Sequence, residues 1–138
     1  EKFMLDLIEM RGIIEPKAAE LAAVRATKEE VAAILSAYDT MAGSGDDRQA
    51  RLEADIQFHS AILRASHNEV LNHFKYAIAA YLKAHFKHGG EVSGEIDDKD
   101  LGRHRQIAWA IAAGKVKSAY SLTVEMLNSN HSHFSRDE

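Results

Sequence analysis

The spacing of apolar residues constrains the fold of this chain more than any other feature of its sequence. Throughout its length, apolar side chains recur every three or four residues, which is the period of an α-helix with one buried face. Runs of alternating β-branched residues, which are typical of strands, are absent, and the 138 residues include a single proline. The pattern therefore predicts an all-α protein.

Capping residues and glycines divide the periodic pattern into helices. Thr27 and Glu30 have the spacing of a capping box, Asn68 is a candidate N-cap, and Gly114 follows a periodic segment as glycine often follows a helix. We expect an antiparallel bundle of six helices, or seven if Pro16 splits the first one rather than bending it. The expected ranges are 3–25, 28–42, 48–65, 68–87, 98–113 and 115–134.

Length and composition exclude several classes of protein. A chain of 138 residues suggests one domain over residues 1–138, and the lack of cysteine rules out disulfides and thiolate metal sites. A net charge of -4 argues against direct binding of DNA by this segment. No apolar run approaches the ~20 residues that span a bilayer, and the first residues do not form a signal peptide. We therefore expect a cytoplasmic domain without membrane contact.

Asp55 and His59 are the most informative polar residues of the sequence. They are four apart in an expected helix and so lie one turn apart on one face. Apolar residues at helical spacing, among them Leu52, Ile56 and Leu63, flank the same face. A carboxylate and an imidazole turned inward need a partner, which could be each other, a third side chain or a metal ion.

Two other expected helices also place a polar residue on their inward side. Arg11 lies four residues after Leu7 in the first helix, and His104 lies on the apolar stripe of the helix over 98–113. Helical bundles build metal and ligand sites from such side chains on facing helices, and one Asp with two His can bind Zn, Ni, Mn or Fe(II). A buried Arg11 requires an anion, which could be Glu15, Asp55 or the carboxylate of a small molecule.

Two other interpretations of the same residues remain open. Asp55 and His59 could form an ordinary hydrogen-bonded pair in a structural or dimerisation bundle without metal. Two His and one carboxylate are also the ligand set of non-haem iron oxygenases. Those enzymes usually have β scaffolds, and no further general base stands out in this sequence, so we expect that the chain is not an enzyme.

Four stretches in the same order resemble the FCD domain, the C-terminal effector-binding and dimerisation domain of FadR-subfamily GntR transcription regulators. They run from Met10 to Pro16, from Leu52 to Ile62, from Ala65 to Leu71 and from Arg103 to Gly114. The resemblance implies a helical bundle with a central cavity for a ligand or metal. It also implies a homodimer and an N-terminal winged helix-turn-helix domain, which is not among these residues. Operator DNA would be bound only by that absent domain.

The resemblance also implies roles for individual residues. In many family members one Asp and three His bind a divalent metal, and here Asp55, His59 and His104 match three of these four ligands. Met126 occupies the position of the third His, and a thioether is a soft ligand that suits Zn or Ni poorly. We expect that a divalent metal, Zn or Ni, is retained with weakened affinity rather than lost. The effector, a small carboxylate, is expected against Arg11 and Met126.

Overall fold

The computed structural model describes residues 1–89 and 98–131, apart from the side chains of residues 88, 89, 130 and 131. The described part of the chain is helical and contains no strand, so the predicted all-α class is confirmed. Its helices are α1 (Lys2–Arg25), α2 (Lys28–Ala42), α3 (Arg48–Ala65), α4 (Glu69–His73), α5 (Lys75–Gly89), α6 (Asp98–Ala112) and α7 (Val116–His131). None of the described helices is long and apolar enough to cross a membrane.

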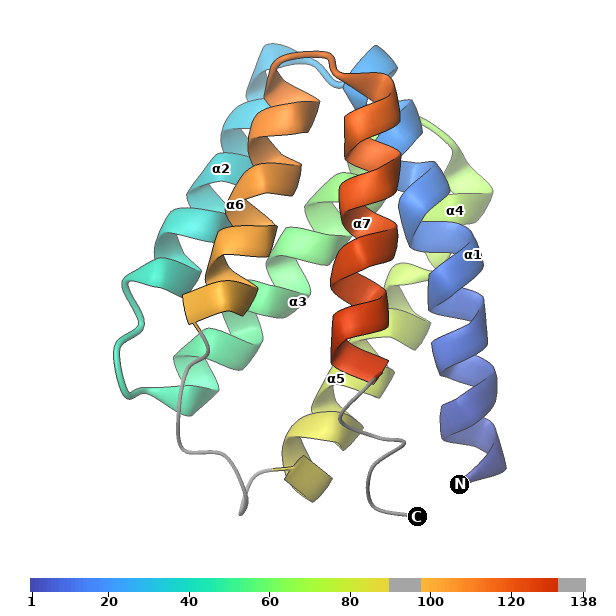
Figure 1. The fold of residues 1–138 in the computed structure, drawn as a ribbon, viewed down its shortest axis with the longest axis vertical. Helices are drawn as coiled ribbons and strands as arrows, with labels where there is room; N and C mark the ends of the chain where they lie inside the picture. Colours follow the sequence, from blue (N-terminus) through green and yellow to red (C-terminus); the bar gives the residue numbers. More distant parts are fainter. Residues whose placement is uncertain (90–97, 132–138) are drawn as a thin grey trace.

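The helices pack as a bundle in which α3 is the central element (Figure 1). Helices α1 and α7 lie side by side on one flank, and α2 and α6 lie side by side on the other. Helix α3 packs against α1, α2 and α5 and carries Phe58, which is fully buried. Aliphatic side chains from the surrounding helices fill much of the interior, including Ile34, Met41, Ile78, Ile107 and Leu127.

Local signals in the sequence fix several helix ends. The Thr27 side chain accepts a hydrogen bond from the Glu30 backbone N–H at 3.1 Å, and the Glu30 side chain accepts one from the Thr27 N–H at 2.9 Å. The predicted capping box is therefore confirmed, as is the N-cap at Asn68. Gly114 has φ +68°, and the Lys115 N–H donates to the Ala110 carbonyl at 2.8 Å, which closes the end of α6.

The structure corrects one expected helix and decides an open alternative about another. The expected helix over 68–87 is two helices, because the Phe74 N–H turns back to the Leu71 carbonyl at 3.0 Å and separates α4 from α5. Val70 in the short α4 is 70% exposed. Pro16 does not split α1, which is a single helix. The expected end of the last helix at 134 lies outside the described residues.

Candidate metal and effector site

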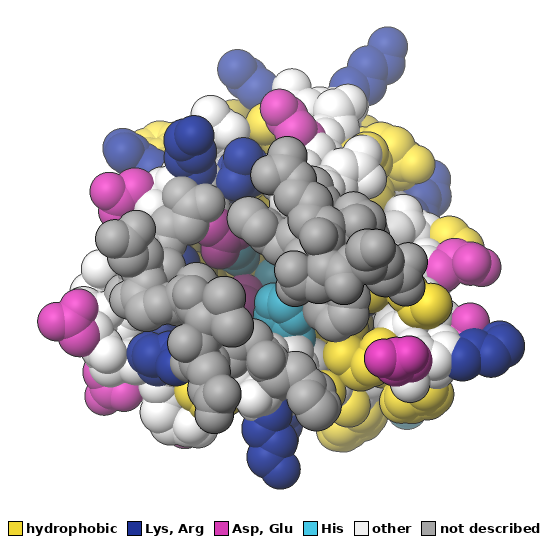
Figure 2. All heavy atoms as spheres, turned by 60° about the horizontal axis from the view of Figure 1, so that its bottom comes forward, with side chains coloured by type: hydrophobic (Ala, Val, Ile, Leu, Met, Phe, Trp, Pro, Cys, Tyr) yellow, Lys and Arg dark blue, Asp and Glu magenta, His cyan; other side chains and the backbone are white. Residues whose placement is uncertain are grey.

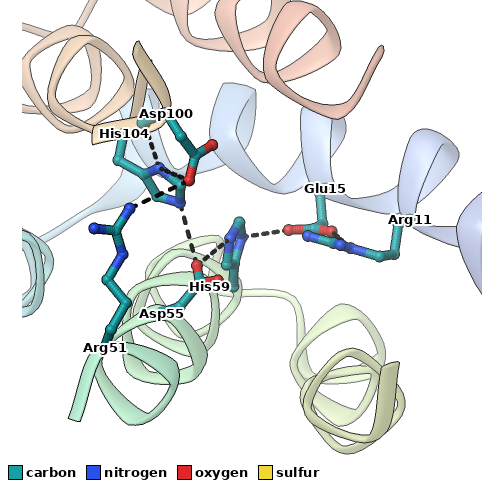
Figure 3. A network of polar contacts seen from close by, with 7 residues as sticks. All are labelled: Arg11, Glu15, Arg51, Asp55, His59, Asp100 and His104. Carbon is teal, nitrogen blue, oxygen red and sulfur yellow. Dashed lines mark hydrogen bonds and ion pairs between the residues drawn. The ribbon is translucent and has the colours of Figure 1, made fainter. Parts of the chain in front are cut away.

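One continuous network of polar side chains connects α1, α3 and α6 (Figure 3). Each helix contributes residues that are four apart and so lie on one face. The network crosses the interior of the bundle between two arginine residues. In order of contact, its members are Arg11, Glu15, His59, Asp55, His104, Asp100 and Arg51.

Asp55 stands at the centre of this network. Its Oδ1 atom lies 3.1 Å from Nε2 of His59 and 3.2 Å from Nε2 of His104. Both imidazoles are buried, whereas the Asp55 side chain is 25% exposed. The sequence placed these three residues on inward helix faces, and the structure brings them together.

The second ring nitrogen of each histidine is also engaged. Nδ1 of His59 lies 2.5 Å from Oε1 of Glu15, and Nδ1 of His104 lies 2.7 Å from the backbone carbonyl of Asp100. Each of these nitrogens faces an acceptor and so must carry a proton and donate it. Both rings are thereby oriented with Nε2 toward Asp55.

The inner end of the network is closed by Arg11. Its side chain is 2% exposed, its Nε donates to Glu15, and its guanidinium lies over the ring of Tyr81, 4.7 Å from the centroid. Of the three partners that the sequence left open, the structure pairs Arg11 with Glu15. The four-residue spacing marks Arg11 and Glu15 as neighbours on α1. The contact between Glu15 and His59, which joins α1 to α3, was not predicted from the sequence.

The outer end contains a pair that the sequence analysis missed. Nη2 of Arg51 lies 3.6 Å from Oδ2 of Asp100, and the two side chains are 15% and 26% exposed. Arg51 is one turn before Asp55 on α3, and Asp100 is one turn before His104 on α6. These spacings show that Arg51 and Asp100 lie on the same helix faces as Asp55 and His104. They do not predict that the two side chains meet, because that depends on how α3 and α6 align.

The network reaches the surface at one end of the bundle. Figure 2 views the end that is at the bottom of Figure 1 and shows histidine and acidic side chains near the middle of that face. The side chains of Asp55 and Asp100 are 25% and 26% exposed. Asp55 and the outer end of the network are thus accessible from solvent, whereas Arg11 and Glu15 are buried.

The amino-acid sequence matches the FCD domain family over residues 6–129. The chain belongs to the FCD domain family. The resemblance read from the sequence is therefore confirmed at the level of this domain.

Curated relatives of this FCD domain carry names of transcription regulators. It is 42% identical to the Galactonate operon transcriptional repressor of Escherichia coli over 79 residues, which are 57% of this chain and 34% of that protein. It is 28% identical to the Putative L-lactate dehydrogenase operon regulatory protein of Escherichia coli over 137 residues, 97% of this chain and 52% of that protein. The chain thus spans between a third and a half of these relatives.

The fold also matches a solved structure, titled Streptococcus agalactiae GntR. The TM-score is 0.79 with 22% sequence identity, and the match covers 93% of this chain and 57% of the other. At this identity the likeness concerns the fold. It supports the helical arrangement that positions the polar network in this FCD domain.

Met126 lies next to the network of the FCD domain, on the side of His59. It is 1% exposed and borders a void of about 10 Å³ together with Glu15, His59 and Thr123. A void of this size has room for about one water molecule. The larger central cavity that the resemblance implies is not confirmed by the described residues and stays a prediction.

Charges within the network shift several pKa values. Burial disfavours ionisation of Glu15, but Arg11 and His59 outweigh this and lower its pKa to about 2. Burial likewise disfavours the charged form of His59, but Glu15 and Asp55 raise its pKa to about 9. The pKa of Asp55 is well below its usual value because hydrogen bonds from His104 and His59 outweigh its burial. Without metal, His59 is therefore an imidazolium at neutral pH.

The central atoms fit a divalent metal ion. A carboxylate oxygen of Asp55 and one nitrogen each of His59 and His104 lie within 4.8 Å of one another. Because both Nδ1 atoms donate elsewhere, a ring that gives up its Nε2 proton on metal binding directs the Nε2 lone pair toward Asp55, and a cation among them would satisfy all three groups. One oxygen and two imidazole nitrogens suit Zn or Ni and leave positions open.

Proposed function

We propose that this chain is the ligand-sensing domain of a bacterial transcription regulator of the GntR family, FadR subfamily. In this proposal it binds a small organic acid through a divalent metal, Zn or Ni, held by Asp55, His59 and His104. The protein acts in the cytoplasm as a homodimer, and operator DNA is bound by a winged helix-turn-helix domain of the same regulator. The domain itself has no catalytic role.

The observation that carries the proposal is the convergence of Asp55, His59 and His104 at the end of the bundle. Three protein ligands leave positions at which water or a carboxylate can bind. The ion would supply a positive charge that attracts the effector. The names of two relatives refer to galactonate and to L-lactate dehydrogenase, which supports a hydroxy acid as the effector class.

The surrounding residues support the proposed ligands from behind. Glu15 and the Asp100 carbonyl hold the two rings in place, and such outer partners commonly raise metal affinity. Arg11 neutralises Glu15 and acts on the site through it. Direct contact of the effector with Arg11 or Met126 stays a prediction, because Arg11 already pairs with Glu15 and Met126 borders only a small void.

Regulation in this proposal uses the positions of the three helices. The ligands come from α3 and α6, and α1 is joined to them through Glu15 and His59. An effector that binds one arrangement of these helices more tightly than another shifts the population toward it. In the homodimer this shift would change the relative placement of the two DNA-binding domains.

Metal analysis and thermal unfolding test the proposal directly. The protein is purified without a His-tag column, loaded with Zn or Ni and screened against L-lactate, glycolate and D-galactonate. We expect bound metal, a higher Tm with metal and a further rise with at least one acid. His104→Ala should weaken Zn binding by more than about tenfold, since a ligand is lost.

His73→Ala is the matched control, because His73 is exposed on α4 and its Nδ1 faces the Glu69 carbonyl at 2.7 Å, outside the polar network. It should retain metal and the response to acids. A wild-type protein that stays metal-free, with a Tm that ignores chelator and acids, would instead favour a structural bundle. The contacts of Asp55 with His59 and His104 would then serve only to hold the helices together.

A further inference from the structure

Arg51 and Asp100 form a loose ion pair that leaves polar atoms of both side chains without a hydrogen-bond partner in the described residues. The Nη2 atom of Arg51 is 3.6 Å from Oδ2 of Asp100, which is beyond hydrogen-bond distance. Its Nη1 atom is buried without a hydrogen-bond partner in the described part of the chain, and so is Oδ1 of Asp100. Buried polar atoms without partners are costly, and a guanidinium with free N–H groups is a potential anion-binding site.

The two arginines of the network differ in their access to the proposed metal ligands. Arg11 is separated from Asp55 by Glu15 and His59, and its side chain is only 2% exposed. Its Nη2 atom is also buried without a hydrogen-bond partner in the described residues, but its Nε donates to Glu15. Arg51 lies one turn from Asp55 on the same face of α3 and next to the residue that precedes His104 by one turn. Arg51 is therefore the guanidinium on the solvent-accessible side of the three proposed ligands.

We propose that Arg51 binds the carboxylate of the effector and that Asp100 is the group which the effector displaces. This inference rests on the proposed function, because it assigns a residue to the same site. The planar fork of an arginine matches a carboxylate in a two-bond geometry, which the present contact with Asp100 does not achieve. The exchange satisfies the N–H groups of Arg51 and releases the first turn of α6.

The proposal makes the charge of the ligand a condition for binding. A carboxylate offers two charged acceptor oxygens to the guanidinium, whereas the corresponding amide offers one neutral oxygen. L-lactate should therefore bind and lactamide should not. Removing the Asp100 charge should help the ligand, because Arg51 would lose its resting partner while the Asp100 backbone carbonyl still orients His104.

The test compares variants of the Zn-loaded chain by calorimetric titration with L-lactate, glycolate, D-galactonate and lactamide. Arg51→Gln should weaken binding of the acids by about tenfold to a hundredfold. Asp100→Asn should tighten it by about threefold or more. Arg64→Gln removes the same charge from an exposed position on α3 and should leave binding unchanged. Zn content should be equal in all four proteins.

The outcomes separate this inference from the proposed function. If the wild-type protein binds none of the acids, both are overturned. If it binds an acid and Arg51→Gln binds that acid equally well, only the role of Arg51 is overturned. If Arg51→Gln loses Zn or fails to fold, Asp100→Asn decides, and unchanged or weaker binding by that variant overturns the exchange.

Discussion

The two ends of the polar network follow the same plan but differ in how tightly they are built. At each end an arginine faces a carboxylate, and the carboxylate residue contacts Nδ1 of a histidine. The inner end is sealed, with Arg11 and Glu15 both about 5% exposed or less. The outer end is partly exposed, and its guanidinium and carboxylate are 3.6 Å apart. In the proposal made above, the inner end stabilises the domain and the outer end responds to a ligand.

The largest expected effect is on stability when an arginine is removed. Arg11→Ala leaves the Glu15 carboxylate buried without its partner and should cost about 3–5 kcal/mol of the free energy of unfolding. Arg51→Ala breaks a loose and partly exposed pair and should cost less than about 1 kcal/mol. Urea unfolding of both variants in the absence of metal measures this contrast, and equal losses would contradict it.

The second-largest expected effect is a pH dependence of the free energy of unfolding, caused by Glu15 and His59 at the inner end. The pKa of Glu15 is lowered from 4.5 to about 2, so its contribution is present above pH 4.5 and is lost as the pH falls toward 2. The pKa of His59 is raised from 6.5 to about 9, so its contribution is present below pH 6.5 and is lost as the pH rises through 9. Each arm should amount to roughly 3 kcal/mol.

Urea unfolding in EDTA between pH 2 and pH 10 measures both arms. His59→Gln should remove the alkaline arm, since the neutral amide has no proton to lose in this range. A wild-type stability that stays level from pH 6.5 to pH 9 would disprove the charged state of His59 in the metal-free protein.

The two ends should also differ in their effect on metal binding. His59 is oriented by the side chain of Glu15, whereas His104 is oriented by the backbone of Asp100. Glu15→Gln should therefore weaken Zn binding by about tenfold to a hundredfold. Asp100→Asn keeps its backbone carbonyl and should change Zn affinity less than about threefold. Competition with a Zn-binding dye measures both, and the opposite order would refute the assignment.

The smallest expected effect comes from a glycine within each end. Gly12 lies between Arg11 and Glu15 in α1, and Gly102 lies between Asp100 and His104 in α6. A Cβ at either position meets no atom within 4 Å. Gly12→Ala and Gly102→Ala should each stabilise the domain by about 0.5–1 kcal/mol, through helix propensity alone. A loss of stability at one of them would show that its helix needs local freedom.

The sequence predicted most of the helices, and it placed Asp55, His59 and His104 on inward faces, because both follow from spacing along one helix. Period and capping residues placed the helix ends at Thr27 and Asn68, and inward positions identified Asp55, His59 and His104. The break at Phe74 was missed because apolar residues continue across it.

The contacts that join the ends of the network could not be predicted in the same way. Glu15 meets His59 only because α1 and α3 cross at a particular height, and Arg51 meets Asp100 only because α3 and α6 do. Helical periodicity defines which face a residue occupies but not the relative height of two helices. Whether Arg11 and Met126 can contact an effector likewise depends on the relative heights of the helices.

The spacing of the network residues has a mechanical consequence. Helix α6 enters the network through Asp100 and His104, one turn apart, so both its height and its rotation are set near its first turn. A helix of this length behaves as a rod of about 20 Å. A tilt imposed at Asp100 is therefore delivered at Ala112, where the tight turn at Gly114 passes it directly to α7. In the proposed mechanism, a change at the Asp100 end of the bundle would thus reach the opposite end through the length of α6.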